Sequence, residues 1–359
     1  MARAGACREV VRGGLVSLMR ASMHGNRAPR WPSGLRFASM SSIAFVFPGQ
    51  GSQSVGMGRD LAVSSAAASA VFAAADAALG ESISAVAWDG PAERLDLTEN
   101  AQPALLAACI AILASLRERW VAAGLREPVP AFAAGHSMGQ YPSLVVAGAL
   151  SLEDGVRLVR RRGELMQASG QGRDGAMAAL IGLDDDRIPE LIARASPHGT
   201  FVVANRNAPG QVVVSGERAA IEAGAAVAKD LGAKRAIVLP VSVAAHSPLM
   251  ADAADAMRET LASITFHDPT VPLLANADGR PITTADGCRT ELVEHLTAGV
   301  DWVGAVGRMR DAGVTTFVEV GPGKVLTGLI KRIAPAAETV PADDPGSSDR
   351  LLDLAAPVT

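Results

Sequence analysis

The chain has 359 residues, of which 49% are hydrophobic, with a mean hydropathy of +0.22 and a net charge of −4. This is enough apolar material for a sizeable core, and the acidic balance argues against a nucleic-acid partner, which requires a strongly basic surface. The longest apolar run, residues 104–116, is too short to cross a membrane and predicts a buried helix. Three scattered cysteines, Cys7, Cys109 and Cys288, argue against a disulfide framework and a zinc site, and we expect reduced thiols.

Residues 1–39 differ in composition from the rest of the chain. They hold seven arginines, no lysine and one acidic residue, Glu9, a net charge of +6 that leaves −10 for residues 40–359. An arginine-rich, acid-poor leader is typical of a transit peptide to the mitochondrial or plastid matrix. In the alternative interpretation, Met40 is the true start and the protein is cytoplasmic, which is our prediction. In both interpretations the leader lies outside the fold.

Strands and helices are predicted to alternate from residue 40 to residue 169. An apolar run that ends in Pro-Gly indicates a buried strand followed by a loop, and Ser151 with Asp154 indicates a helix N-terminus. The predicted elements are strand 43–47, helix 101–120, strand 131–134 and helices 140–149 and 155–168.

The pattern changes after Gly170. The order becomes βαββαβ, which is the ferredoxin-like arrangement, and we expect residues 170–241 to form a small inserted subdomain. Its predicted elements are strand 176–181, helix 184–195, strands 201–204 and 212–215, helix 217–231 and strand 235–240.

The first pattern resumes at residue 242 with helix 247–263, strand 271–275, helices 288–298 and 302–312, strand 316–320 and helix 323–333. We therefore expect residues 40–169 and 242–333 to form one large α/β subdomain. Residues 334–359 are rich in Pro, Ala, Asp and Ser, which predicts a loose tail with a short helix over 351–354.

A nucleophile motif lies between a predicted strand and a predicted helix. Residues 135–139 read Gly-His-Ser-Met-Gly, the G-x-S-x-G pattern in which a tight turn exposes the Ser137 hydroxyl at a helix N-terminus. The structural alternative is an ordinary glycine-rich turn. Because the flanking strand and helix fit the motif, we predict that Ser137 is a nucleophile.

A serine nucleophile needs a base, and five histidines outside the leader are candidates. His136 adjoins the serine and is expected to point away from its hydroxyl; His198 and His267 lie in polar turns, and His295 lies in a helix. His246 follows a predicted strand and precedes a helix start, and loops at the carboxyl ends of strands are where α/β sites form. We therefore choose His246; the alternative is a loop histidine that faces solvent.

The glycine-rich loop 48–56 invites a phosphate-binding interpretation, but Met57 occupies the position of the lysine that a P-loop requires. Such a loop can instead bring a backbone N–H to a reacting carbonyl, and Gln50 is the natural donor. Predicted helix 155–168, downstream of the nucleophile, carries four arginines, Arg157, Arg160, Arg161 and Arg162, and such a run usually indicates a solvated face. Arg162 lies on a different side from Arg160 and Arg161 and, if it turned inward, would need an anion such as a substrate carboxylate.

Seven segments in the expected order resemble malonyl-CoA:acyl carrier protein transacylases of the discrete bacterial type, over residues 43–333. They are Phe45-Val-Phe-Pro-Gly-Gln-Gly-Ser-Gln53, Gln102-Pro-Ala-Leu105, Gly135-His-Ser-Met-Gly139, Arg162-Gly163, Pro209-Gly-Gln-Val212, Pro240-Val-Ser-Val243 with His246, and Glu319-Val-Gly-Pro-Gly-Lys324.

The resemblance implies a large α/β-hydrolase-like subdomain with an inserted ferredoxin-like one. It implies a ping-pong enzyme with Ser137 as nucleophile and His246 as base, and with an oxyanion hole formed by the backbone N–H groups of Gln50 and Met138. Arg162 would hold the malonyl carboxylate. A backbone carbonyl would orient the histidine, and by position we assign it to Asp301 or a close neighbour.

The implied partners are malonyl-CoA and a holo acyl carrier protein, in fatty acid biosynthesis; no metal or bound cofactor is required, and we expect a monomer. The chain departs from the family pattern at Gln140, where a glutamate is usual, and at Gly299-Val-Asp-Trp302, where Pro-Val-x-Trp is usual. Two other functions are open to this sequence: a serine hydrolase, which would release the free acid, and a non-enzymatic relative with a vestigial site.

Overall fold

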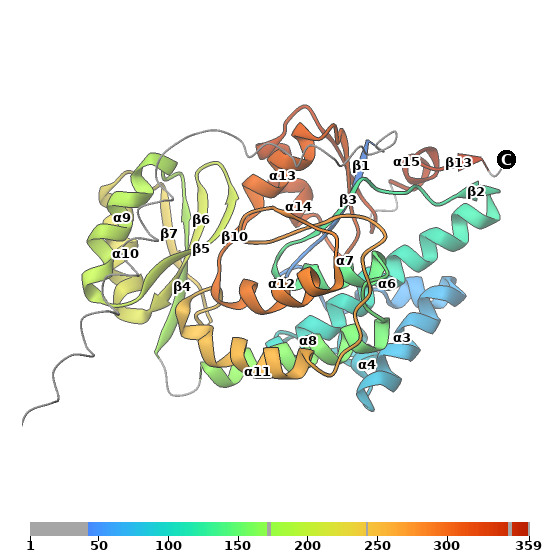
Figure 1. Cartoon of the computed structure of the whole chain (residues 1–359), viewed down its shortest axis with the longest axis horizontal. Coiled ribbons are helices and arrows are strands. Elements are labelled where there is room, and N and C mark those ends of the chain that lie inside the picture. Colours follow the sequence, from blue (N-terminus) through green and yellow to red (C-terminus); the bar gives the residue numbers. More distant parts are fainter. Residues whose placement is uncertain (1–41, 171–173, 242, 344–346, 358–359) are drawn as a thin grey trace, which may run out of the picture. The chain divides into compact units, whose positions relative to one another are not determined.

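The computed structural model describes residues 42–170, 174–241, 243–343 and 347–357, so the predicted leader lies outside the described residues. A six-stranded sheet forms the centre of the larger part, in the order β12-β11-β1-β3-β8-β9 (Figure 1). Neighbouring strands are parallel except for β8 and β9. The strands are β1 (Ile43–Phe47), β3 (Phe132–Gly135), β8 (Leu273–Leu274), β9 (Pro281–Ile282), β11 (Thr316–Glu319) and β12 (Glu338–Pro341).

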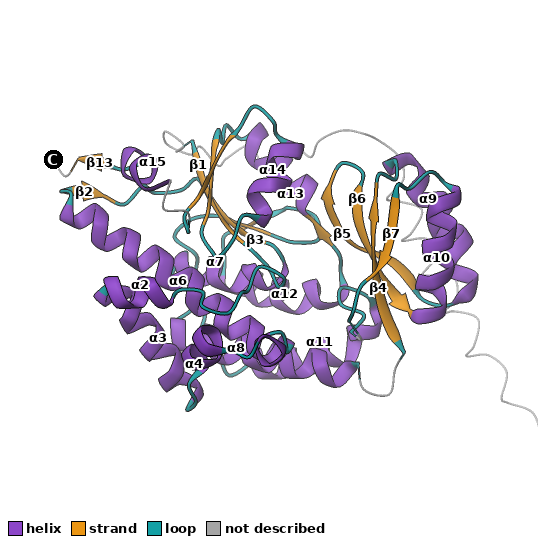
Figure 2. Cartoon of the chain, turned by 180° about the vertical axis from the view of Figure 1, so that it is seen from behind, coloured by secondary structure: helices purple, strands orange, loops and turns teal. Residues whose placement is uncertain are grey.

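Helices pack beside this sheet, and the core of this part includes buried residues of β1, β3 and α6. Because β1 and β3 are buried along their whole lengths, their sequences are apolar runs without alternation. The helices, grouped beside the sheet in Figure 2, are α2 (Arg59–Ser64), α3 (Ala66–Leu79), α4 (Ile83–Asp89), α5 (Ala92–Leu95), α6 (Thr98–Ala122), α7 (Gln140–Val146), α8 (Leu152–Ser169), α11 (Ala251–Leu261), α12 (Ala285–Thr297), α13 (Trp302–Asp311) and α14 (Val325–Ile333).

A second sheet has the order β10-β5-β6-β4-β7, and the pairs among β4 to β7 are antiparallel. Its chain order is the predicted βαββαβ, and α9 and α10 lie together beside it in both views (Figures 1 and 2). Its elements are β4 (Gly175–Ile181), α9 (Ile188–Ala195), β5 (Phe201–Ala208), β6 (Gln211–Glu217), α10 (Arg218–Asp230) and β7 (Arg235–Val238). The mixed α/β class is as the sequence predicts.

The second sheet also includes β10 (Val300–Asp301), which pairs in parallel with β5. This strand comes from the part of the sequence assigned to the large subdomain. The second sheet therefore contains a strand from each of the two predicted subdomains, and a division of the chain at residue 241 does not separate them fully.

The prediction of a loose tail after residue 333 is wrong for the residues that the structure describes there. β12 extends the central sheet, with Val340 buried, and Leu351 of α15 (Ser348–Asp353) is buried as well. Trp120 Nε1 donates to the Leu351 carbonyl at 2.9 Å, and β13 (Ala356–Pro357) pairs with β2 (Leu125–Arg126). Edge strands often carry charged residues and proline, as Glu338 and Pro341 do here, so a polar composition does not exclude one.

None of the helices in the described ranges is both long enough and apolar enough to cross a membrane.

Candidate active site

The loops that follow β1, β3 and β8 leave the central sheet at the same edge, because these strands are parallel and adjacent. The first loop contains Gln50, the second contains Ser137, and the third begins after Leu274 and contains Asn276. In parallel α/β sheets, this carboxyl edge is where ligands bind. The topology alone therefore brings the predicted nucleophile and the predicted oxyanion loop together.

Ser137 has the strained backbone of a nucleophile elbow, with φ of 54°. The flanking glycines permit the turn: a Cβ on Gly135 would lie 1.9 Å from the Gly139 carbonyl carbon, and one on Gly139 would lie 2.1 Å from the Phe47 oxygen. No side chain fits at either position. Ser137 opens a short 3-10 helix (Ser137–Gly139) that leads into α7, so its hydroxyl lies at a helix start as the motif predicts.

His246 is hydrogen-bonded to the serine, with 2.8 Å between Ser137 Oγ and His246 Nε2. Its own φ is 57°, so both members of the pair have left-handed backbones that non-glycine residues rarely adopt. His246 Nδ1 donates to the His295 carbonyl at 2.6 Å and lies 3.2 Å from the Ala298 carbonyl. Because carbonyls only accept, Nδ1 carries the hydrogen and Nε2 is free to accept from the serine hydroxyl.

The environment keeps His246 neutral. Burial, followed by the charge of Arg162, lowers its pKa to about 3, so the ring is an unprotonated acceptor at neutral pH. This is the state that a general base needs before the reaction begins.

The assignment of the orienting carbonyl to Asp301 is wrong. The carbonyls that face His246 belong to His295 and Ala298, near the end of α12. Asp301 instead begins α13, where its Oδ1 accepts from the Gly304 N–H at 3.0 Å. A sequence position cannot reveal which of several adjacent carbonyls turns toward a ring, because that depends on how the helix ends.

Asp301→Ala is expected to cost stability but not catalysis. Loss of a helix N-cap costs about 1 kcal/mol, whereas the carboxylate takes no part in the hydrogen bonds of His246. We expect a lower Tm and an acylation rate within about twofold of wild type, with Asp301→Asn restoring the Tm. A large loss of acylation rate at unchanged Tm would instead assign the carboxylate to the catalytic pair.

Arg162 turns inward from α8 and is 2% exposed. Its Nη2 donates to Ser137 Oγ at 3.1 Å and its Nη1 donates to Gln102 Oε1 at 2.8 Å. Gly163 makes this position possible, because a Cβ there would lie 2.5 Å from Glu99 Cα at the start of α6. Within the described part of the chain no carboxylate pairs with Arg162, and burial lowers its pKa. A buried guanidinium without a counterion is costly unless a ligand supplies the anion.

The oxyanion loop packs its backbone directly against the elbow. A Cβ on Gly49 would lie 2.7 Å from the His136 carbonyl oxygen, so only glycine allows this approach. Met138 is the second residue of the 3-10 helix and precedes Gly139, whose N–H is bonded to the His136 carbonyl. At this helix start the N–H of Met138 has no intrahelical acceptor.

A chain of hydrogen bonds connects this loop to Arg162. Thr98 Oγ1 donates to Gln50 Oε1 at 2.8 Å, and Gln102 Nε2 donates to Thr98 Oγ1 at 2.9 Å. Since Gln102 Oε1 receives Arg162, the side chain of Gln50 is fixed by the same residues that fix the guanidinium. In the sequence, Gln102 is noted only as part of a family motif. Its polar side chain at the start of an apolar helix could have indicated that it binds a buried polar group.

Comparison with known proteins shows to which family this chain belongs. The acyl transferase domain family matches residues 44–345. The malonyl CoA-acyl carrier protein transacylase of Escherichia coli (strain K12) is 45% identical over 315 residues, which cover 88% of this chain and 100% of the relative. That of Bacillus subtilis (strain 168) is 42% identical over 307 residues, 85% of this chain and 95% of the relative. The chain belongs to this transacylase family.

Solved structures agree with this assignment. An acyl carrier protein S-malonyltransferase from Vibrio cholerae matches with a TM-score of 0.81 and 43% identity, covering 87% of this chain and 100% of the other. A malonyl transacylase in complex with a type II polyketide acyl carrier protein matches with a TM-score of 0.81 and 39% identity, covering 87% and 99%. The protein is accordingly an acyltransferase.

One departure from the transacylase pattern has a structural explanation. Gln140 is buried, its Oε1 accepts from the Gly135 N–H at 3.3 Å, and its Nε2 donates to the Leu274 carbonyl at 3.1 Å. A carboxylate could accept the first bond but could not donate the second. The amide therefore links the elbow to β8 in this transacylase.

The other histidines take different positions. His136 Nε2 donates to Asn207 Oδ1 on β5 at 2.8 Å, so this ring points to the second sheet and away from the Ser137 hydroxyl, as predicted. His295 is fully buried, with its ring centroid 6.2 Å from that of His246 and 6.0 Å from that of Tyr141. Its place in a helix, which argues against a role as base, gives no sign that its carbonyl orients the base.

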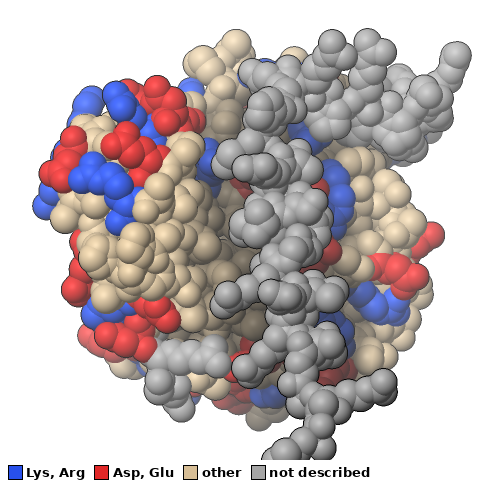
Figure 3. All heavy atoms as spheres, turned by 60° about the vertical axis from the view of Figure 1, so that its left-hand side comes forward, with Lys and Arg blue, Asp and Glu red and all other residues tan. Residues whose placement is uncertain are grey.

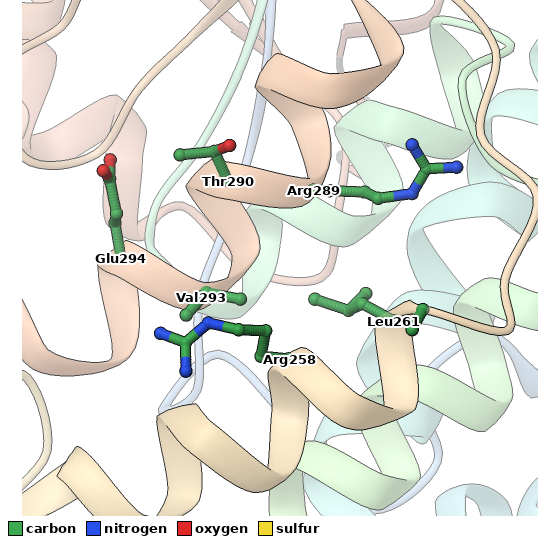
Figure 4. A pocket seen from close by; sticks show the side chains of 7 residues that line it. Arg258, Leu261, Arg289, Thr290, Val293 and Glu294 are labelled. Carbon is green, nitrogen blue, oxygen red and sulfur yellow. The ribbon is translucent and has the colours of Figure 1, made fainter.

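Two other charged regions of the described surface consist of side chains that pair with one another. Figure 3 shows basic and acidic side chains interspersed on the side of α9 and α10, where Arg194 pairs with Asp230. A hollow of about 400 Å³ lies between α11 and α12, but Arg258 and Arg289 point to opposite sides of it (Figure 4). Each of them is paired with an aspartate. No group of three or more His, Cys, Asp or Glu residues within the described ranges is placed to hold a metal ion.

Proposed function

We propose that this chain transfers a malonyl group from malonyl-CoA to the phosphopantetheine thiol of an acyl carrier protein, through a malonyl ester on Ser137, in fatty acid biosynthesis. The observation that carries the proposal is the buried guanidinium of Arg162, 3.1 Å from Ser137 Oγ, for which the described protein supplies no carboxylate. An acyl group with a terminal carboxylate would supply it. The names of the relatives and the carrier-protein complex among the solved structures support the same donor and acceptor.

The first half of the cycle forms the ester. His246 Nε2 takes the hydroxyl proton as Ser137 Oγ attacks the thioester carbonyl, and the N–H groups of Gln50 and Met138 stabilise the negative charge on the carbonyl oxygen. The carbon–sulfur bond then breaks, and protonated His246 gives its proton to the leaving CoA sulfur. The imidazolium that forms transiently is stabilised by the His295 carbonyl, which accepts from Nδ1.

The second half repeats these steps with the carrier thiol. His246 removes the thiol proton, the sulfur attacks the malonyl ester, and Ser137 Oγ leaves with the proton that His246 returns. The malonyl carboxylate stays bound to Arg162 throughout, so that the acyl group has one orientation in both halves. Arg162 donates to Ser137 Oγ in the free enzyme and gives up this bond when the substrate carboxylate arrives.

Intact mass spectrometry after mixing with malonyl-CoA tests the proposal. We expect a malonyl adduct on the wild type, none on Ser137→Ala, and a much weaker signal with acetyl-CoA. The adduct should disappear on addition of holo acyl carrier protein, with malonyl appearing on the carrier. Release of free malonate without a trapped ester would indicate a hydrolase, and no turnover of malonyl-CoA would indicate a vestigial site.

A further inference from the structure

Asn276 is the centre of a buried hydrogen-bond network behind the nucleophile. It follows β8 and is 3% exposed. Its Oδ1 accepts from the Ser137 N–H at 2.9 Å. Its own N–H and its Nδ2 both donate to Glu291 Oε1, at 2.7 and 3.1 Å, and its carbonyl accepts from the Asp301 N–H at 2.7 Å. The side-chain amide is thus held with its oxygen facing the nucleophile, because Glu291 accepts and cannot donate when ionised.

Glu291 and His295 are one helical turn apart on α12, so they lie on the same face of that helix. Both side chains are buried, at 1% and 0% exposure. Glu291 Oε1 accepts hydrogen bonds from Asn276, and Asn276 Oδ1 accepts one from the backbone N–H of Ser137. The carbonyl of His295 receives the ring of His246. A single turn of α12 therefore contacts both members of the catalytic pair, one through Asn276 and one directly.

From this arrangement we propose that Glu291 is a positioning residue. Through Asn276 it holds the Ser137 backbone in a fixed position relative to the last turn of α12, whose carbonyl at His295 orients His246. The proposal rests on the roles of Ser137 and His246 in the proposed function. Glu291 does not contact the reacting atoms. It acts on the distance between Ser137 Oγ and His246 Nε2 through the backbone of Ser137.

Three features support this positioning role. Ser137 and His246 both have left-handed backbones, which persist only where the surroundings hold them. The two side chains come from separate segments of the chain, so their 2.8 Å contact depends on how α12 sits against the elbow. Burial also raises the pKa of Glu291 to about 6, so an ionised carboxylate at this position costs stability rather than adding to it.

The test compares Glu291→Ala with Glu291→Gln. Glutamine keeps an oxygen that can accept from Asn276, whereas alanine leaves Asn276 free to turn. Glu118→Ala is the matched control, because Glu118 also accepts from a backbone N–H, that of Ala67 at 2.8 Å, but at the start of α3. Each variant is measured for Tm, for the kcat and KM of malonyl transfer, and for the rate at which diisopropyl fluorophosphate modifies Ser137. That reagent forms an Oγ–P bond with loss of fluoride and contains no carboxylate for Arg162.

We expect Glu291→Ala to lower both kcat and the fluorophosphate modification rate by about 10- to 100-fold with little change in KM, as a misplaced reacting pair does. Glu291→Gln should stay within about threefold of wild type in both rates, since the acceptor is retained. Glu118→Ala should lower the Tm without lowering either rate. The proposal is overturned if Glu291→Ala behaves like Glu118→Ala, or if Glu291→Gln loses as much activity as Glu291→Ala.

Asn276→Ala provides a second route if Glu291→Ala does not fold. It removes the acceptor of the Ser137 N–H and should reduce the modification rate to a similar extent. If both single variants fold, their losses should not add in the double variant, because both residues act through one contact; additive losses would contradict the chain of contacts. If the wild type does not transfer malonyl groups but is still modified by the fluorophosphate, the proposed function is rejected. The positioning role of Glu291 can then still be tested through the modification rate.

Discussion

His246→Ala is expected to slow the formation of acyl-Ser137 by about 10²- to 10⁴-fold, the usual contribution of a general base. His246 Nε2 accepts a hydrogen bond from the Ser137 hydroxyl at 2.8 Å. Without the ring, the hydroxyl must lose its proton to a weaker base. Quenched-flow mass spectrometry of the acyl-enzyme measures the rate directly. His198→Ala, which removes an exposed histidine of the second subdomain, is the control and should react like wild type.

The pH dependence of this step follows from the environment of His246. Its pKa is lowered to about 3 by burial first and by the charge of Arg162 second. The unprotonated form therefore persists on lowering the pH, and kcat/KM for acylation should stay nearly constant between about pH 8 and pH 5. An inflection near 6.5, the ordinary histidine value, that persists in Glu291→Gln would mean that the His246 ring is solvated in the free enzyme and that its pKa is not lowered by burial.

Arg162→Ala is expected to abolish the preference for malonyl over acetyl groups. A charge-assisted hydrogen bond contributes about 1.5–3 kcal/mol, which corresponds to roughly 10- to 150-fold in rate. The ratio reaches about 10⁴ where the wrong substrate leaves a buried polar group unpaired, as acetyl would leave this guanidinium. The variant should lose malonyl transfer and retain or gain acetyl transfer, measured as kcat/KM for both CoA esters.

Two variants separate the carboxylate role from general damage. Arg162→Lys keeps the charge but loses the planar fork, so it should recover only part of the malonyl rate. Arg160→Ala alters the same helix at a residue that pairs with Glu81 and Asn100, and should keep the malonyl preference. Equal losses for malonyl and acetyl in Arg162→Ala would show that the guanidinium serves the nucleophile rather than the substrate.

The elbow and its base could be predicted because each follows from a local pattern. Gly135 and Gly139 are required because a Cβ at either position would overlap neighbouring backbone atoms, and His246 lies between a strand-like run and a helix start. The structure places the Ser137 hydroxyl and the His246 ring 2.8 Å apart. Arg162 differs from its neighbouring arginines in its side of the helix, and it is buried beside the serine.

The remaining parts of the site could not be predicted, for physical reasons that differ. The orienting carbonyl is backbone, and every residue has one, so the sequence carries no signal for His295 in that role. In the sequence, Glu291 is one of several acidic residues in a predicted helix. Only the packing of α12 shows that its side chain is buried. Asn276 did carry a signal, because it is a polar residue directly after a buried strand, as a site residue of a parallel sheet should be. The edge strand β12 gave no signal because its composition is polar.

The pairing of β10 with β5 has a consequence for how substrates enter. Two subdomains joined by a modest interface usually move relative to one another, but here a hinge would break backbone hydrogen bonds at Val300 and Asp301. It would also break the contact of His136 with Asn207 and that of Arg332 with the Pro209 carbonyl. The second sheet should therefore move together with α13, which follows β10 directly, and binding of CoA or of the carrier's prosthetic arm should not require closure of one subdomain on the other.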